Sequence, residues 1–185
     1  MRVIAYYTEG TPYEQEISHL EASMIRHNIT YTLLGVPSKG SWTANCALKP
    51  ELILRAMVDL HPDENIFYVD ADAEFARFPE LFADMERYYS YLVPKWNKTG
   101  EILSGSLYFR NCAQSKELLE MWIKMQTDDE WDQKVLARVL NARDWQNGDY
   151  LPLEYCKIFD NMDEIEDPVI VHNQASRRFK KVIDG

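Results

Sequence analysis

Long apolar runs are absent from this sequence, and no stretch approaches the roughly 20 residues that a membrane-spanning helix needs. We therefore expect no membrane span. Cysteine is scarce: Cys46, Cys112 and Cys156 are odd in number, far apart, and form no Cys-x-x-Cys motif. This usage predicts reduced cysteines in a cytoplasmic protein. The opening residues, MRVIAYYTEG, show no secretory signal pattern, in keeping with that localisation.

Glycine-rich phosphate-binding motifs are also missing, because neither G-x-G-x-x-G nor G-K-[ST] occurs. A dinucleotide fingerprint and a P-loop are therefore excluded. The formal net charge of -10 argues against broad binding to a nucleic-acid backbone, which draws on clustered Lys and Arg. One basic cluster, SRRFKK at 176–181, stands apart, and it fits an anion site or a solvated tail equally well.

The chain of 185 residues is 46% hydrophobic, which is typical of one globular domain with a real core. In the first half, expected strands alternate with expected helices, an order that predicts a parallel, right-handed, doubly wound arrangement. In the second half, four further strands surround two helices. The expected strands are 2–7, 29–36, 65–70, 88–94, 104–110, 153–159 and 168–172. We predict an α/β fold: a Rossmann-like, mostly parallel central sheet flanked by helices.

Two aspartates, Asp70 and Asp72, follow the apolar run 66–69, which is typical of a strand buried on both faces. Residues i and i+2 of an extended chain point to the same side, so both carboxylates can face one object. A divalent ion such as Mn²⁺ or Mg²⁺ suits this pair, although an acidic turn is a simpler alternative. An EF-hand is excluded, because Phe75 and Leu81 occupy the positions of its glycine and glutamate.

Five sequence blocks in this order carry a family resemblance: GSWTANCALKPELI, IFYVDADAEFARFPELF, SGSLYFRN, WDQKVLARVL and IVHNQASRR. Together they resemble the GT-A glycosyltransferases, most closely the compact nucleotide-diphospho-sugar transferases and more distantly the glycogenin-type and blood-group transferases. The resemblance covers nearly the whole chain. It implies a single glycosyltransferase domain over 1–185, with a nucleotide-binding half at 1–90 and a sugar and acceptor half at 91–185.

The resemblance also implies a metal site for Mn²⁺ or Mg²⁺. Asp72 ligates the ion most directly, and His172, which closes an apolar strand, is the expected third ligand. Asp70 ligates it too, directly or through water, or reaches the ribose or sugar. A core or surface position is the alternative for His172.

Donor-binding roles follow from the same resemblance. Tyr6 and Thr8 lie where the family binds base and ribose. Trp42 stacks on the base, closes as a lid, or simply packs. Lys49 resembles a basic residue near the donor, or is a surface lysine, and Gly105 allows the sugar to approach closely or marks a strand bulge.

Arg177, with Arg178 as its substitute, is the expected diphosphate ligand, although the glycine and lysine that follow the histidine in glycogenin-type enzymes are missing. Asp132 and Gln133 match an acidic helix start that faces the donor sugar, so we predict them as catalytic residues. A helix cap accounts for Asp132 equally well.

The predicted function is metal-dependent transfer of a sugar from a UDP- or GDP-sugar to an acceptor hydroxyl, with retention favoured over inversion. The acceptor hydroxyl stays open between a glycan, a protein and a hydroxymethylated base in DNA. Two alternatives remain. One is a non-catalytic module that binds a nucleotide sugar or metal. The other is a phosphatase like the haloacid dehalogenases, from whose motif Glu74 departs.

Overall fold

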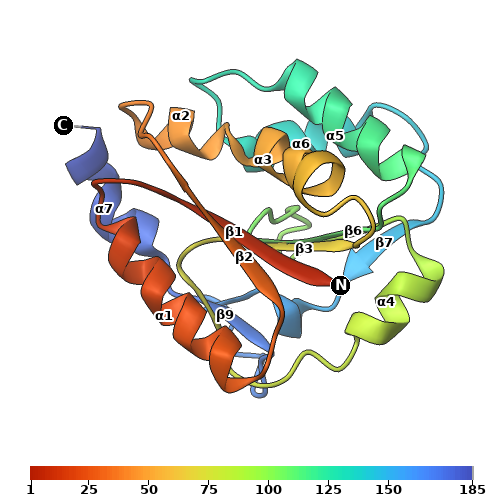
Figure 1. Cartoon of the computed structure of the whole chain (residues 1–185), viewed down its shortest axis with the longest axis horizontal. Helices are drawn as coiled ribbons and strands as arrows, with labels where there is room; N and C mark the ends of the chain where they lie inside the picture. The colour runs from red at the N-terminus through yellow and green to blue at the C-terminus, as the bar shows by residue number, and fades with distance from the viewer. Residues whose placement is uncertain (185) are drawn as a thin grey trace.

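The computed structural model describes residues 1–184, apart from the side chains of residues 181 and 182. A six-stranded sheet with the order β2-β1-β3-β6-β5-β7 crosses the middle of the molecule (Figure 1). β6 pairs antiparallel with both β3 and β5, whereas the other neighbours pair in parallel. The predicted fold class is confirmed. The strands are β1 (Arg2–Thr8), β2 (Tyr31–Val36), β3 (Ile66–Val69), β5 (Tyr91–Pro94), β6 (Ser106–Phe109) and β7 (Gly148–Leu151).

Helices cover both faces of this sheet, as Figure 1 shows. One layer contains α2 (Trp42–Cys46), α3 (Lys49–Arg55), the π-helix η1 (Ala56–Leu60), α5 (Ala113–Met125) and α6 (Asp132–Asn141). On the other face lies α1 (Tyr13–Arg26), and α4 (Phe82–Tyr88) leads into β5. Strand β3 is fully buried because its residues alternate between the layers: Tyr68 packs in the core of α3, α5 and α6, and Phe67 in the core of α1.

A second sheet of three short strands, in the order β4-β9-β8, packs below the first. Its strands are β4 (Ala73–Phe75), β8 (Lys157–Ile158) and β9 (Ile170–His172), and α7 (Ala175–Ile183) follows β9. The predicted strand at 153–159 is wrong in most of its length, because the chain forms the 3-10 turn η2 (Leu153–Tyr155) before the two-residue β8. Pairing of β4 with β9 brings residue 73 opposite residue 172.

No helix within residues 1–184 combines the length and the apolar character needed to cross a bilayer.

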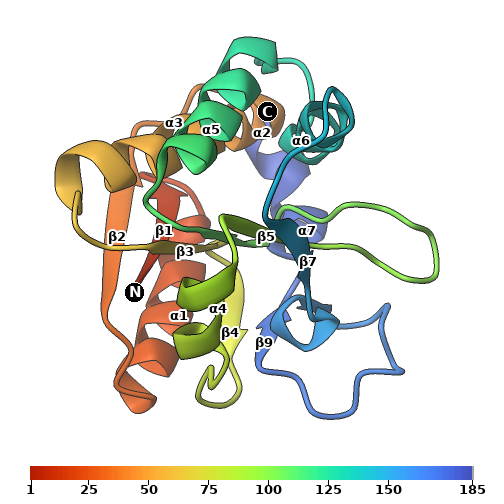
Figure 2. The ribbon, with the colours of Figure 1, turned by 90° about the vertical axis from the view of Figure 1, so that its right-hand side faces the viewer.

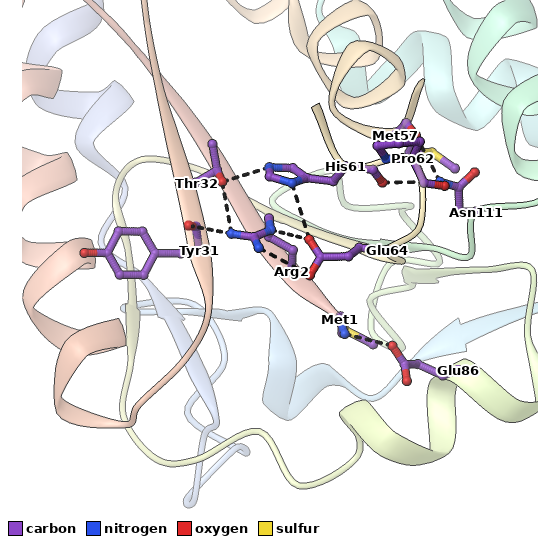
Figure 3. Close-up of polar contacts among 10 residues, drawn as sticks. All are labelled: Met1, Arg2, Tyr31, Thr32, Met57, His61, Pro62, Glu64, Glu86 and Asn111. Atoms are coloured by element: carbon purple, nitrogen blue, oxygen red, sulfur yellow. Dashed lines mark hydrogen bonds and ion pairs between the residues drawn. The ribbon is translucent and has the colours of Figure 1, made fainter. Parts of the chain in front are cut away.

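A polar network ties the sheet together at the end opposite Asp70 (Figure 3). Arg2 binds the Glu64 carboxylate with two nitrogens and also reaches the Tyr31 carbonyl oxygen, 3.3 Å away. His61 Nε2 lies 2.9 Å from Thr32 Oγ1, and His61 Nδ1 lies 3.3 Å from Glu64 Oε2. The network therefore joins the starts of β1 and β2 to the turn before β3.

This network predicts that the protein loses stability in acid. Hydrogen bonds from Arg2 lower the pKa of Glu64, and burial followed by the Arg2 charge lowers the pKa of His61. Both groups therefore bind protons more readily in the unfolded chain, so the free energy of unfolding should fall as pH drops below about 6.5, the ordinary histidine pKa. We expect His61 to account for about 1 kcal/mol or less, since it is partly exposed.

Urea unfolding at pH 7.5, 6.0 and 5.0 measures this effect, and His61→Gln should flatten the curve between pH 7 and 6. An unchanged slope in that variant would contradict the assignment to His61.

Candidate active site

The chain turns sharply where β3 ends, at Asp70. The Asp70 amide donates to the Gly105 carbonyl oxygen (2.9 Å), and the Ala73 amide donates to the Asp70 carbonyl oxygen (3.0 Å). Residues 70–72 therefore form a turn and not the extended chain that we expected. Asp70 and Asp72 still face one point. They do so because the chain turns between them, whereas we expected them to lie on the same side of a strand.

His172 completes a three-residue group with these aspartates. Ala73 pairs with His172 across the second sheet, and one ligand atom from each of Asp70, Asp72 and His172 lies within 4.8 Å of the others. His172 Nε2 is 2.9 Å from Ser106 Oγ, and Nδ1 is 3.8 Å from Asp72 Oδ1. When Nε2 is protonated and donates to Ser106, Nδ1 is free to ligate, which is how second-sphere partners usually orient a metal-binding histidine.

One carboxylate oxygen of each aspartate, Oδ1 of Asp70 and Oδ2 of Asp72, is already bound by groups of the protein. Tyr68 donates to Asp70 Oδ1 (2.7 Å), and Lys49 Nζ lies 2.9 Å from the same oxygen. Asp72 Oδ2 accepts from the Ala175 amide at the start of α7 (2.8 Å). These contacts leave Asp70 Oδ2 and Asp72 Oδ1 for a cation, together with His172 Nδ1.

Gly105 makes room for this group. A Cβ atom at position 105 would lie 2.9 Å from His172 Cε1 and 3.3 Å from Asp70 Oδ2. Real Cβ atoms almost never come as close as the first of these contacts, so any side chain larger than glycine would force His172 to move. Two carboxylate oxygens and one imidazole nitrogen in such a cradle are a donor set that suits Mn²⁺ or Mg²⁺.

The surroundings shift the pKa values of all three side chains. Burial raises the pKa of Asp70, although Lys49 opposes the change. The pKa of Asp72 is lowered despite burial, because the contacts with His172 and the Ala175 amide stabilise its charge. Burial lowers the pKa of His172, but Cys156 and Asp72 raise it to about 10. A cation that binds here must therefore displace a proton from His172, as metal binding to histidine generally does.

Lys49 is the centre of a buried charge cluster. Its Nζ lies 2.7 Å from Asp132 Oδ2 and 2.9 Å from Asp70 Oδ1, and it donates to the Ser104 carbonyl oxygen (3.0 Å). Asp132 is also buried, and within the described side chains its Oδ1 has no hydrogen-bond donor. Burial lowers the pKa of Lys49, but Asp132 and Asp70 together raise it well above its ordinary value. The surface lysine that was the alternative is therefore excluded.

The three candidate ligands line one pocket of about 520 Å³, together with Lys49, Gly105 and Asp132. That volume is typical of a site for a small molecule or cofactor. The structure brings eleven of the twelve predicted site residues to its wall: Tyr6, Thr8, Trp42, Lys49, Asp70, Asp72, Gly105, Asp132, Gln133, His172 and Arg177.

Arg178 is the predicted residue that the structure places elsewhere. Its guanidinium pairs with Glu16 of α1 at 2.9 Å, away from the pocket. Arg177 lines the pocket and pairs with Asp160. Lys180, one turn further along α7, also lines it. Lys181 of the same basic cluster lies outside the described side chains.

Trp42 and the C-terminal helix meet across one end of the pocket. Trp42 Nε1 donates to Tyr13 OH (3.2 Å), and Lys180 Nζ lies 4.6 Å from the centroid of a Trp42 ring. The Trp42 amide donates to Asp184 Oδ1 (2.7 Å). Tyr6 lies deeper, with its hydroxyl donating to the Asn45 carbonyl oxygen (2.9 Å). This end is aromatic, whereas Asp70, Asp72 and His172 make the middle of the pocket acidic.

Family models and curated protein sequences give no match to this chain. Among solved structures, it matches the crystal structure of a glycosyltransferase involved in the glycosylation of the major capsid of PBCV-1. The TM-score is 0.73 at 13% identity, covering 100% of this chain and 98% of that one. The chain has a glycosyltransferase fold. It also matches the WbbM bifunctional glycosyltransferase in its apo form (TM-score 0.63, 12% identity), covering 94% of this chain but 45% of that one.

The glycosyltransferase fold explains why the pocket lies where it does. Open α/β sheets bind ligands beyond the carboxyl ends of their parallel strands, and β1 and β3 end at Thr8 and Val69 beside this pocket. The second sheet and α7 then close the site from below.

Several lining residues escaped the sequence analysis. Trp96 and Glu101 lie on the loop between β5 and β6, and Trp131 precedes α6. Trp96 and Glu101 belong to a polar segment outside the five sequence blocks, so neither periodicity nor family resemblance points to them. Trp131 opens the block WDQKVLARVL, but the analysis assigned roles only to the two residues that follow it. A tryptophan within a polar loop was the one available signal, and Trp42 was identified by it.

Proposed function

We propose that this protein is a metal-dependent glycosyltransferase that moves a sugar from a nucleotide-diphosphate sugar to an acceptor hydroxyl. One observation carries the proposal: Asp70, Asp72 and His172, from segments a hundred residues apart, converge on the wall of a pocket large enough for such a donor. The glycosyltransferase fold raises the expectation, but the argument for the activity rests on this site.

Asp70, Asp72 and His172 would hold the Mn²⁺ or Mg²⁺ ion. Such an ion, when bound, acts as a Lewis acid that stabilises the negative charge of a departing nucleoside diphosphate. Ser106 orients His172, and the Ala175 amide orients Asp72, so that both ligands are fixed before an ion arrives. Preorganised ligands of this kind lose little entropy on binding.

The aromatic end of the pocket suits the nucleoside of a UDP- or GDP-sugar. Tyr6, Tyr13 and Trp42 offer ring faces there, and Thr8 ends β1 beside them. Arg177 and Lys180 of α7 also line the pocket, and we assign to them the diphosphate that would link this nucleoside to the metal group of Asp70, Asp72 and His172. Arg177 remains our proposed diphosphate ligand, and Lys180 takes the second position that we expected for Arg178. Lys49 is occupied by Asp70 and Asp132, so we propose that it positions these acids.

Asp132 and Gln133 begin α6 opposite the metal group. Asp132 keeps one buried oxygen without a donor in the described chain, so that oxygen can accept from a sugar hydroxyl or serve as a base. Gln133 Nε2 donates to Glu101 Oε1 (2.7 Å), and Gln133 Oε1 accepts from the Ser104 amide (3.3 Å). Gln133 is therefore held in place between two partners. We favour retention of configuration, as the resemblance implies.

We propose that residues 1–90 form the nucleotide-binding half and residues 91–185 the sugar and acceptor half. Tyr6, Thr8 and Trp42 of the first half and Asp132 and Gln133 of the second line the same pocket, which supports this division. We also propose a cytoplasmic location, since all three cysteines are unpaired.

The direct test is turnover of a panel of UDP- and GDP-sugars with Mn²⁺, measured as release of the nucleoside diphosphate. We expect release with at least one donor and its loss when the metal is chelated. Donor binding without any release would favour a non-catalytic binding module. If neither binding nor release occurs across the panel, the proposal is wrong.

A further inference from the structure

The loop between β5 and β6 contributes two side chains, Trp96 and Glu101, to the wall of the pocket. Figure 2 shows it as a long light-green arm that extends beyond the central sheet. Lys95 and Ile102 form an antiparallel bridge at its base, and the Trp96 amide donates to the Glu101 carbonyl oxygen (2.8 Å). The loop is therefore a closed hairpin that presents Trp96 and Glu101 together, and both line the pocket.

Trp96 is held by packing. It lies against a small apolar cluster of Leu103, Cys156, Met162 and Ile165, which joins the loop to the segment after η2. Its indole Nε1 is covered and has no acceptor within the described residues. The ring face is therefore what Trp96 can offer to a ligand in the pocket.

The Glu101 side chain is exposed, but a hydrogen bond fixes the direction of its carboxylate. Gln133 donates to its Oε1 at 2.7 Å, and Gln133 is itself held by the Ser104 amide. Within the side chains that the structure describes, Glu101 Oε2 has no partner. An exposed glutamate normally samples many rotamers, and anchoring one oxygen leaves the other as an oriented acceptor for hydroxyl groups.

We infer that Trp96 and Glu101 form an acceptor subsite for a neutral carbohydrate, an inference that rests on the proposed transferase function. A ring face beside an oriented carboxylate matches the two sides of a sugar: its apolar C–H face and its rim of hydroxyl groups. The subsite borders Asp132 and Gln133, so a bound sugar would present a hydroxyl towards the metal group.

The charges around Trp96 and Glu101 favour a neutral saccharide over DNA as the acceptor. No lysine or arginine of the loop lines the pocket, and the protein carries a net charge of -10. Glu101 and Asp132 line this part of the pocket and Lys49 is already paired with two acids, so a phosphodiester chain that entered here would meet two carboxylates. An uncharged sugar meets no such repulsion.

The acceptor test compares three classes with the donor that the panel identifies: p-nitrophenyl mono- and disaccharides, serine and threonine peptides, and a duplex with 5-hydroxymethylcytosine. We expect transfer to a saccharide. Glu101→Gln should raise the KM for that acceptor about tenfold, the usual effect of weakening one charge-assisted hydrogen bond. Trp96→Ala should raise it about thirtyfold, and Trp96→Phe, which keeps a ring face, less than about fivefold. The KM for the donor should stay within about twofold in all three variants.

Matched controls are Glu120→Gln on α5 and Phe78→Ala before α4, both exposed and outside the pocket. They should change neither KM. Preferred transfer to the peptides or the duplex, or an unchanged acceptor KM in Glu101→Gln and Trp96→Ala, would overturn the inference while leaving the transferase function intact.

Binding gives a second readout that needs no turnover. Saturation-transfer NMR with the same saccharides, in the presence of UDP and Mn²⁺, should show contacts in the wild type that weaken in Trp96→Ala. If no saccharide binds, the subsite is wrong, whatever the turnover assay reports. If saccharides bind but no donor is turned over, Trp96 and Glu101 still form a saccharide site, but its role as an acceptor site fails together with the proposed function.

Discussion

Replacing Asp72 with asparagine should lower metal-dependent turnover at least about a thousandfold. Loss of one charged ligand weakens the hold on the cation, and about 4 kcal/mol of lost transition-state stabilisation corresponds to that factor. Asparagine keeps an oxygen that can accept from the Ala175 amide, so the start of α7 should remain in place. Nucleoside diphosphate release and calorimetric titration with Mn²⁺ measure the two effects.

The control for this variant is Asp163→Asn, which removes the same charge from an exposed position. It should keep wild-type turnover and metal affinity. Comparison with Asp72→Ala separates metal binding by this side chain from its hydrogen bond with the Ala175 amide. Alanine removes both, and loss of the hydrogen bond should cost about 1 kcal/mol of stability. Full turnover in Asp72→Asn would exclude this residue as a metal ligand.

Replacing Lys49 with methionine should destabilise the protein by about 3–5 kcal/mol, because it leaves the buried Asp132 carboxylate without its counter-charge. For a chain of this length that loss corresponds to a fall of about 10 °C in Tm. Thermal unfolding measures it. The double variant Lys49→Met/Asp132→Asn should recover part of the loss, since removing both charges costs less than stranding one of them.

Lys134→Met, on the exposed side of α6, is the matched control and should shift Tm little. If Lys49→Met unfolds at the wild-type temperature, the cluster of Lys49, Asp70 and Asp132 does not have the energetic role that its geometry implies. The cluster is also the reason why Lys49 cannot serve as a free cation for the donor phosphates.

Local sequence was enough to predict the order of strands and helices from β1 to β3. Short apolar strands alternate there with helices, and this order leads to parallel pairing because each crossover is right-handed. Local sequence did not predict the backbone at 153–159, where we expected a strand and the chain forms a 3-10 turn instead. A short apolar run predicts that its residues are buried, but it does not predict which backbone conformation buries them.

The basic cluster at 176–181 shows that local sequence also fails to predict which side chains reach the pocket. Arg177, Arg178 and Lys180 are near neighbours in sequence, but a helix turns successive side chains by about 100°. Arg177 and Lys180, three residues apart, face the pocket, while Arg178 faces Glu16 of α1. Composition alone could not distinguish them, because the choice depends on where α7 begins.

The sequence by itself determined the α/β class, since hydrophobic pattern is a local property, and the family resemblance named Asp70, Asp72 and His172 as candidate metal ligands. Tertiary structure alone decided how the group is assembled: the turn after β3, the pairing of Ala73 with His172, and the space that Gly105 leaves. It also decided that Trp96 and Glu101 belong to the pocket. These are contacts between segments 30 to 100 residues apart, and only burial of the whole core brings such segments together.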